Sequence, residues 1–261
     1  MIDLHCHLLP GIDDGPKDIE TSIAMAKIAV KDGIKITACT PHIYQGLYNN
    51  NASLIKKHTS NLQKILKEKG ITLSLTFASD THIHPDLIDQ INKKQVPTFN
   101  SGRYFLLEPS HHQAPLFLDI YVDKILASGL VPVMTHPERL SYIKDSFAIY
   151  TSLIQKGAWI QITAGSLTGN FGKNAQYWAE RFMNEGKVHL IASDAHGVNR
   201  RPPILSDGLE IAKRALGEEE AMKLVIERPR AVLDNRNPFD VSPIGFLNQK
   251  SLWHKLKNKF F

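Results

Sequence analysis

The sequence predicts an α/β fold in which parallel strands close into a seven-stranded barrel, a smaller and distorted relative of the eight-stranded one. Seven short apolar, β-branched runs recur along the chain, and stretches with apolar residues at three- and four-residue spacing separate them. Five glycines stand where a helix should end before the next strand, since glycine tolerates the left-handed conformation that closes a helix. This repetition favours parallel βα units over an all-β or helical-bundle fold.

The expected elements follow one another without a long linker. Strands are predicted over residues 2–6, 34–40, 71–78, 104–107, 130–135, 159–163 and 188–192. Helices are predicted over residues 18–32, 53–69, 115–128, 145–156 and 173–185. Because no low-complexity segment precedes residue 235, we expect one barrel domain over residues 1–235 and a C-terminal tail over residues 236–261.

The composition is that of a globular protein, with 43% hydrophobic and 22% charged residues among 261. No run approaches the roughly 20 apolar residues of a membrane span, and the N-terminus lacks a signal-peptide pattern, so we expect a cytoplasmic protein. Cys6 and Cys39 fall in predicted strands and are interpreted as small core residues rather than a disulfide. The net charge of +5 is compatible with an anionic substrate without identifying one.

Part of the positive charge lies in residues 250–261, where lysines alternate with aromatic and apolar residues. Such a basic tail is compatible with contact to anionic lipid or to a partner protein. The alternative is a frayed terminus or a helix packed on the domain.

The first predicted strand carries an unusual polar set. Asp3, His5 and His7 alternate with apolar residues, and the two-residue period of a strand should place the three on one face. We expect the apolar set to face the outer helices. Imidazoles on an inner face are unfavourable unless something binds them, whereas the alternative is a pair of solvated histidines on an edge strand.

Other predicted strands also end in imidazole or carboxylate groups. A single His or Asp after a strand is more often a cap or turn residue, but six such groups are not plausibly all caps. The C-terminal ends of barrel strands open on one face, where catalytic groups gather. The groups at these strand ends are His42, Asp80, Glu108, His136, Asp194 and His196.

Together with residues near the N-terminus, these groups form a candidate metal site. Mixed His and carboxylate ligands without thiolates suit manganese, iron or zinc. Nine ligands exceed what one ion takes, so we expect two or three ions, with Glu108 as a natural bridge. The nine candidates are His5, His7, Asp14, His42, Asp80, Glu108, His136, Asp194 and His196.

Clustered ions of this kind predict hydrolysis of a phosphate ester, because they activate water and neutralise phosphoryl charge. Arg139 and Arg201 follow metal-site motifs closely and have guanidinium groups that match phosphate oxygens. Taken singly, an arginine is more often a surface ion-pair residue, and it is the position of these two beside the metal-site motifs that favours a phosphate-binding role.

Five motifs carry a resemblance to a known family. They are DLHCH at residues 3–7, LPGIDDG at 9–15, TPH at 40–42, THPER at 135–139 and SDAH at 193–196. In order and spacing over about residues 1–235 they resemble the polymerase and histidinol phosphatase (PHP) superfamily, and more narrowly its CpsB/CapC-type manganese-dependent bacterial protein-tyrosine phosphatases.

The resemblance implies a distorted (β/α)7 TIM-like barrel, the PHP fold, with a trinuclear centre usually assigned to manganese. It also implies removal of phosphate from a bacterial tyrosine autokinase that controls capsule or exopolysaccharide assembly. We expect no nucleic-acid partner, although the net charge alone is compatible with one. Carried over by position, the nine residues above are the metal ligands, and Arg139 and Arg201 bind the phosphate.

One departure concerns Asp80, where the family generally has glutamate. The shorter side chain leaves the third metal least secure, and His82 or a water is a candidate to complete the coordination. His111 and His112 follow Glu108 and lie either near the site or in an exposed loop, and the loop is the interpretation we favour. Tyr44, Tyr48 and Phe171 are candidates to line the approach of a substrate ring.

Two alternatives stay open. One is a small-molecule phosphatase of the same superfamily, such as a histidinol phosphatase, with the same metals and another pocket. The other is a catalytically weak binding or regulatory subunit, against which the near-complete ligand set argues.

Overall fold

The computed structural model describes residues 1–241, and the basic tail segment at residues 250–261 lies outside the described residues. Within the described residues, the strands are β1 (Ile2–Cys6), β2 (Ile36–Cys39), β3 (His42–Ile43), β4 (Ser74–Phe77), β5 (Asp80–His82), β6 (Tyr104–Glu108), β7 (Val131–Thr135), β8 (Trp159–Thr163) and β9 (Leu190–Ala192). All their pairings are parallel. The predicted α/β barrel is confirmed.

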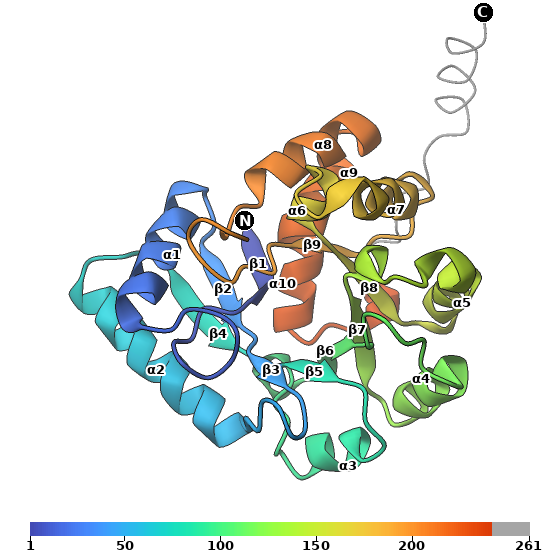
Figure 1. The fold of residues 1–261 in the computed structure, drawn as a ribbon, viewed down its shortest axis with the longest axis horizontal. Helices are drawn as coiled ribbons and strands as arrows, with labels where there is room; N and C mark the ends of the chain where they lie inside the picture. Colours follow the sequence, from blue (N-terminus) through green and yellow to red (C-terminus); the bar gives the residue numbers. More distant parts are fainter. Residues whose placement is uncertain (242–261) are drawn as a thin grey trace, which may run out of the picture.

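The strands form two sheets, and two segments of the chain pass from the first sheet into the second. One sheet has the order β1-β2-β4, and the other has the order β3-β5-β6-β7-β8-β9. The predicted second strand continues from β2 through Thr40 and Pro41 into β3, and the third continues from β4 into β5. A parallel bridge between Cys6 and Ala195 joins β1 to the chain after β9 and completes the ring (Figure 1). Seven chain segments therefore surround the barrel.

The five predicted helices are present with small shifts at their ends. They are α1 (Ile19–Lys31), α2 (Ala52–Glu68), α4 (Leu118–Ala127), α5 (Ile143–Lys156) and α7 (Gly172–Asn184). Local chemistry sets these limits: the Asp18 side chain accepts the Thr21 N–H at the start of α1, and Asn51 does the same for Leu54 at α2. At the end of α5, Gly157 takes a left-handed φ of 113°, which terminates the helix.

Further helices fill the C-terminal third and the connections. They are α3 (Leu87–Asn92), α6 (Ala164–Leu167), α8 (Ser206–Leu216), α9 (Glu218–Met222), a π-helical stretch (Lys223–Glu227) and α10 (Arg228–Leu233). Three 3-10 turns complete the set, η1 (Phe99–Ser101), η2 (Pro137–Arg139) and η4 (Pro238–Asp240). None of the helices among residues 1–241 has the length and apolar character needed to cross a bilayer.

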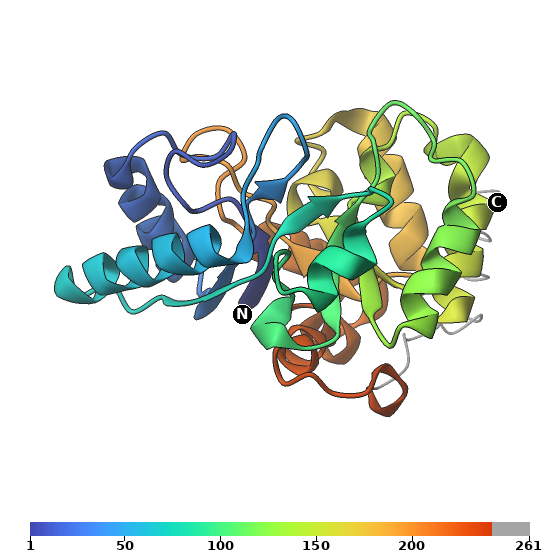
Figure 2. The same cartoon turned by 90° about the horizontal axis from the view of Figure 1, so that it is seen from below.

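The α10 helix closes the barrel at the end where the strands begin. Val232 and Leu233 pack there in a small core with Ile2, Leu4 and Leu106. Figure 2 shows this C-terminal region, in red, on one side of the strands, with the loops after β1 and β3 on the other. The contacts continue to Arg236, whose backbone carbonyl accepts the Tyr104 hydroxyl at 2.9 Å. With one end filled by apolar side chains, only the C-terminal ends of the strands are left to carry a site.

The first strand departs from the alternation predicted for it. Ile2 and Leu4 pack in the small core with α10, whereas Cys6 joins the larger core with Met25 and Ala26 of α1. The cause is a shift in the register between β1 and β2 that falls between Asp3 and Cys6. The prediction that all three apolar residues face the outer helices is therefore wrong for Ile2 and Leu4. Cys6 and Cys39 are buried free thiols, as expected.

Candidate metal centre

The two histidines of the first strand project their rings into the site, each held by a side-chain partner. His5 Nδ1 lies 2.8 Å from Gln161 Oε1 on β8, and His7 Nδ1 lies 2.7 Å from Asp13 Oδ2. Both rings are fully buried. A hydrogen bond at Nδ1 fixes the ring orientation and leaves Nε2 free to bind an ion. The Nε2 atoms of the two rings lie 3.2 Å apart.

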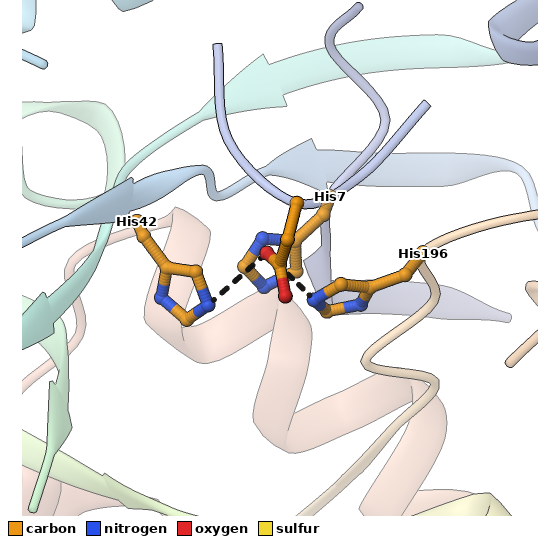
Figure 3. A group of neighbouring side chains, drawn as sticks. His7, His42 and His196 are labelled. Atoms are coloured by element: carbon orange, nitrogen blue, oxygen red, sulfur yellow. Dashed lines mark ion pairs between the residues drawn. The ribbon is translucent and has the colours of Figure 1, made fainter. Parts of the chain in front are cut away.

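A first group of possible ligands combines three histidines with Asp14. Figure 3 shows the rings of His7, His42 and His196 turned toward one another, although they come from three different segments. Asp14 Oδ1 lies 3.5 Å from His42 Nε2 and 3.3 Å from His196 Nε2. One ligand atom from each of the four residues fits within 4.8 Å of the others, so a single ion can reach all four.

A second region lies around the carboxylates of β5 and β6. Asp80 Oδ2 is 3.4 Å from His5 Nε2 and 3.4 Å from His42 Nδ1. Glu108 Oε2 is also 3.4 Å from His42 Nδ1, and its Oε1 is 3.6 Å from His136 Nε2. The two oxygens of Glu108 thus face different imidazoles, an arrangement compatible with the bridging role predicted for it.

Asp194 connects the histidines to the two arginines. Its Oδ1 lies 3.2 Å from His5 Nε2, and its Oδ2 accepts hydrogen bonds from Arg139 Nη1 and Arg201 Nη2. Asp194 and His136 both have left-handed backbones, with φ of 49° and 32°. A positive φ is uncommon outside glycine, and residues held in it cluster at functional sites.

Asp3 stabilises this strand end without joining the ligand groups. Its Oδ1 accepts the Ser193 N–H at 3.0 Å, and its Oδ2 accepts the Ser193 hydroxyl at 2.5 Å. The carboxylate is completely buried, and burial raises its pKa to about 6. Asp3 therefore holds β1 against the residue before Asp194, a structural role within the polar set of the first strand.

Neighbouring charges and burial together set the protonation of the groups in the cluster. Burial opposes the charged form of His7, but Asp13 and Asp194 outweigh it and raise its pKa to about 10. Burial likewise opposes the charged form of Asp194, yet His5 and the two arginines hold its pKa well below the usual range. Burial and Arg139 lower the pKa of His136 well below its usual value, so this ring is neutral and able to bind a metal.

The residues fit a group of bound metal ions. All nine predicted ligands fall into overlapping clusters whose donor atoms lie within 4.8 Å of one another. Both Asp80 oxygens are buried and have no hydrogen-bond partner among the described residues. A carboxylate left this way is costly unless a cation binds it. Donor atoms separated by 3.2–3.6 Å match ligands that surround one ion at roughly 2.0–2.2 Å each.

A family comparison identifies the chain. Residues 1–234 match the family described as capsular polysaccharide synthesis, CpsB/CapC. The protein is a member of the CpsB/CapC family.

Its relatives in the CpsB/CapC family match along almost their full length. The chain is 32% identical over 243 residues to the tyrosine-protein phosphatase YwqE of Bacillus subtilis, covering 93% of this chain and 95% of that protein. It is 28% identical over 238 residues to the tyrosine-protein phosphatase CpsB of Streptococcus pneumoniae, covering 89% and 98%. The crystal structure of YwqE, described with CpsB as unique metal-dependent tyrosine phosphatases, superposes with a TM-score of 0.86 at 32% identity, covering 94% of this chain and all of that one.

For this CpsB/CapC family member, sequence reasoning placed His111 wrongly. His111 lies in the loop after β6 but is only partly exposed, and its Nε2 is 3.3 Å from Glu108 Oε1. It groups with Glu108 and His136 as a tenth possible ligand. His112 is exposed, as expected of a loop residue. His82 belongs to none of the ligand groups and instead stacks on Tyr44, with ring centroids 4.1 Å apart.

Sequence reasoning missed Asp13 and Gln161, the two side chains that contact Nδ1 of His7 and of His5. Neither residue stands at the end of a strand. Asp13 stands beside Asp14 in the LPGIDDG motif, so the sequence offers two adjacent acids without saying which one faces the ions. Gln161 is two residues before the end of β8, and only the barrel geometry brings it to His5.

The three aromatic candidates separate onto two sides of the site. Tyr44 and Tyr48 line a cavity of about 360 Å³ together with most of the possible ligands and both arginines. Phe171 lies beneath the arginines, with its ring centroid 4.2 Å from Arg139 Cζ and 5.7 Å from Arg201 Cζ. Such cation–π contacts hold the two guanidinium groups against the face of the Phe171 ring.

Proposed function

We propose that this protein is a metal-dependent protein-tyrosine phosphatase whose active site is the cavity lined by Asp14, Glu108, Arg139 and Arg201. The observation that carries the proposal is the convergence of buried imidazoles and carboxylates on one cavity that two arginines also enter. The relatives that the chain matches over nearly their whole length are named tyrosine-protein phosphatases.

The metal ligands in this proposal are the nine residues predicted from the sequence, with His111 as an additional one. We propose manganese as the metal, in two or three ions. The hard carboxylates and the imidazoles of the site support it, and the absence of thiolates among the candidate ligands argues against a soft-metal site. When bound, such ions supply Lewis-acid charge and lower the pKa of water at the site.

The arginines bind and orient the phosphate in this mechanism. Each uses one Nη atom on Asp194, and a guanidinium offers five N–H donors in all. The Nε of Arg201 is buried and has no hydrogen-bond partner among the described residues, so this guanidinium keeps an unsatisfied donor beside the site. Asp194 thereby positions both cations over the metal ligands before substrate arrives, which reduces the reorganisation needed in the transition state.

The cavity suits an aromatic ester. Tyr44, Leu47 and Tyr48 form its outer wall, with Tyr44 stacked on His82 and Tyr48 stacked on His42. A phosphotyrosine ring can pack against these side chains while its phosphate reaches the arginines. An open, partly apolar rim is compatible with a tyrosine on a polypeptide, whereas no feature of the described residues singles out histidinol phosphate.

The cellular role is proposed from the family. We infer a phosphorylated tyrosine autokinase of capsule or exopolysaccharide assembly as the substrate, in the cytoplasm, with residues 1–235 as the catalytic barrel. Contact of the basic tail with a membrane belongs to the same proposal, but that tail lies outside the described residues.

The test compares metal content with activity. Protein purified without chelator should contain transition metal, and with Mn²⁺ it should hydrolyse p-nitrophenyl phosphate and phosphotyrosyl peptides faster than histidinol phosphate. His136→Ala should lose bound metal and at least about 100-fold in kcat/KM, whereas the control His58→Ala, on α2, should keep both.

Three results would count against the proposal. Full activity in His136→Ala would refute the site, and a clear preference for histidinol phosphate would favour the small-molecule phosphatase. Absence of bound metal together with inactivity in Mn²⁺ would favour a regulatory subunit.

A further inference from the structure

A second cavity of about 460 Å³ adjoins the metal centre. It lies among α6, the turn before α7, the start of α8 and the chain over residues 199–204. Arg201 lines both cavities, so the second one begins where the proposed phosphate site ends. We call it the flanking cavity.

Phe171 forms the wall between the two. It lines the flanking cavity, while Arg139 and Arg201 lie over its ring on the side of the metal centre. A Cβ on Gly165 would stand 2.9 Å from Phe171 Cε2, closer than real Cβ atoms come to other atoms. Glycine at this position therefore lets the ring sit close against α6 and keeps the wall thin.

The lining of the flanking cavity combines an apolar floor with polar groups at the rim. Ala164 and Gly208 are buried, whereas Asn170, Asn199 and Arg200 are exposed. Side-chain amides can bond both the N–H and the C=O groups of an extended backbone. These features suit a polypeptide segment better than a wholly apolar ligand.

The charged side chains at the flanking cavity indicate which side chains a bound polypeptide segment should have. Within the described residues, Arg200 makes no ion pair, while Arg201 is already paired with Asp194. The one acidic side chain that lines the flanking cavity is Asp207, in the first turn of α8. Arg200 can therefore form an ion pair with an acidic ligand, whereas Asp207 would repel such a ligand.

We propose that the flanking cavity binds the residues next to the phosphotyrosine and that Arg200 pairs with an acidic side chain there. The inference rests on the proposed phosphatase function and names the substrate class for it, a phosphotyrosine with an Asp or Glu within a few residues. Consecutive Cα atoms are about 3.8 Å apart, so a segment whose tyrosine enters the metal centre must continue along the adjoining surface.

The experiment uses three substrates and matched variants of the full chain with Mn²⁺. The substrates are p-nitrophenyl phosphate, a phosphotyrosyl peptide with neutral neighbours, and the same peptide with glutamates beside the phosphotyrosine. Arg200→Gln should raise KM for the acidic peptide roughly two- to fivefold, the scale of a partly exposed ion pair, with kcat retained. It should leave the other two substrates unchanged.

Asp207→Asn should change KM for the acidic peptide in the opposite direction to Arg200→Gln. It should lower KM for the acidic peptide, while the control Arg214→Gln, which removes an exposed positive charge elsewhere on α8, should change nothing. The preference of the wild-type protein for the acidic peptide should also weaken as salt rises.

A binding measurement separates this inference from the proposed function. Anisotropy of a labelled acidic peptide that carries a non-hydrolysable phosphotyrosine analogue, recorded with Mn²⁺, should show weaker binding to Arg200→Gln than to wild type. Hydrolysis with equal affinity for acidic and neutral peptides would overturn the inference and leave the phosphatase intact. Failure to hydrolyse any substrate, with the binding preference present, would instead overturn the proposed function alone.

Discussion

Asp13 and His7 are joined by a hydrogen bond of 2.7 Å between Oδ2 and Nδ1. The same carboxylate accepts the N–H of Gly15 at 2.9 Å and the N–H of His42 at 3.1 Å. One side chain therefore orients the ring of a candidate ligand and ties the loop after β1 to the start of β3. Asp13 belongs to none of the possible ligand groups found among the described residues, so it is a positioning residue.

Replacement of Asp13 should weaken metal binding more than catalysis by the loaded enzyme. In Asp13→Asn the His7 ring loses its charged partner, and loss of such a partner typically costs about 10- to 100-fold in metal affinity. Titration of metal-free protein with Mn²⁺, followed by calorimetry and by activity, measures the shift. Saturating Mn²⁺ should restore most of kcat. Asp18→Asn is the control, because Asn also caps a helix; equal metal affinities in both variants would contradict the orienting role.

Replacing either arginine by lysine should impair catalysis and leave the metals in place. Lysine keeps the positive charge, but it lacks the planar guanidinium whose several donors can bond Asp194 and a phosphate oxygen at the same time. We expect Arg139→Lys and Arg201→Lys each to lower kcat/KM roughly 10- to 100-fold. Metal analysis and steady-state kinetics with p-nitrophenyl phosphate test this. A parallel loss of metal would mean that the arginines act by holding Asp194, not by binding phosphate.

His189 should make the protein less stable at mildly acidic pH. Burial, helped by Arg228, lowers its pKa from 6.5 to about 3, and its Nδ1 accepts the Ile160 N–H at 3.0 Å. Between pH 3 and 6.5 the unfolded chain thus binds a proton that the folded protein does not, so the free energy of unfolding falls as pH decreases through this window. At pH 5 the loss amounts to about 2 kcal/mol.

The matched variant for this effect is His189→Asn, which keeps an acceptor for Ile160 but does not titrate. Urea unfolding at pH 5 and pH 7 should show a smaller difference in the variant than in the wild type. The same difference in both proteins would exclude His189 as the source.

Gly208→Ala should destabilise the fold although alanine favours helices. A Cβ at this position would lie 2.8 Å from Ala164 Cβ and 2.9 Å from Ala164 Cα, where α8 crosses α6. The steric cost, roughly 1–3 kcal/mol, exceeds the gain in helix propensity of up to about 1 kcal/mol. Denaturant unfolding measures the net loss. Addition of Ala164→Gly should recover part of it, because only the contact with Cβ is removed; a stabilised single variant would contradict the close approach.

The barrel and the candidate ligands could be predicted from the sequence because both depend on local patterns. Hydrophobic runs and helix-ending glycines mark βα units, and parallel strands place their C-terminal ends together. His42, Asp80, Glu108 and His136 each follow from this rule alone. The helices α8 to α10 were not predicted, and of these α10 fills the barrel end, a role that depends on contacts with Ile2 and Leu4 far away in the sequence.

Other features depend on contacts between distant segments. The bond of Gln161 to His5 spans 156 positions, and no local pattern marks it. An exposed loop was the favoured place for His111, yet its ring reaches Glu108, with His111 Nε2 3.3 Å from Glu108 Oε1. The register shift in β1 likewise arises from pairing with β2, and it altered the expected direction of Ile2 and Leu4.

The bridge between Cys6 and Ala195 has a consequence for the lifetime of the fold. It joins the first and last strands of the ring, and the candidate ligands beside it, His5 and His7 on one side and Asp194 and His196 on the other, come from those same two ends. An ion shared between them would cross-link the chain across about 190 positions, a closure that costs an unfolded polymer considerable entropy. Metal concentration should then govern how often the ring opens, and a cell depleted of the metal would hold a protein that proteases cut sooner.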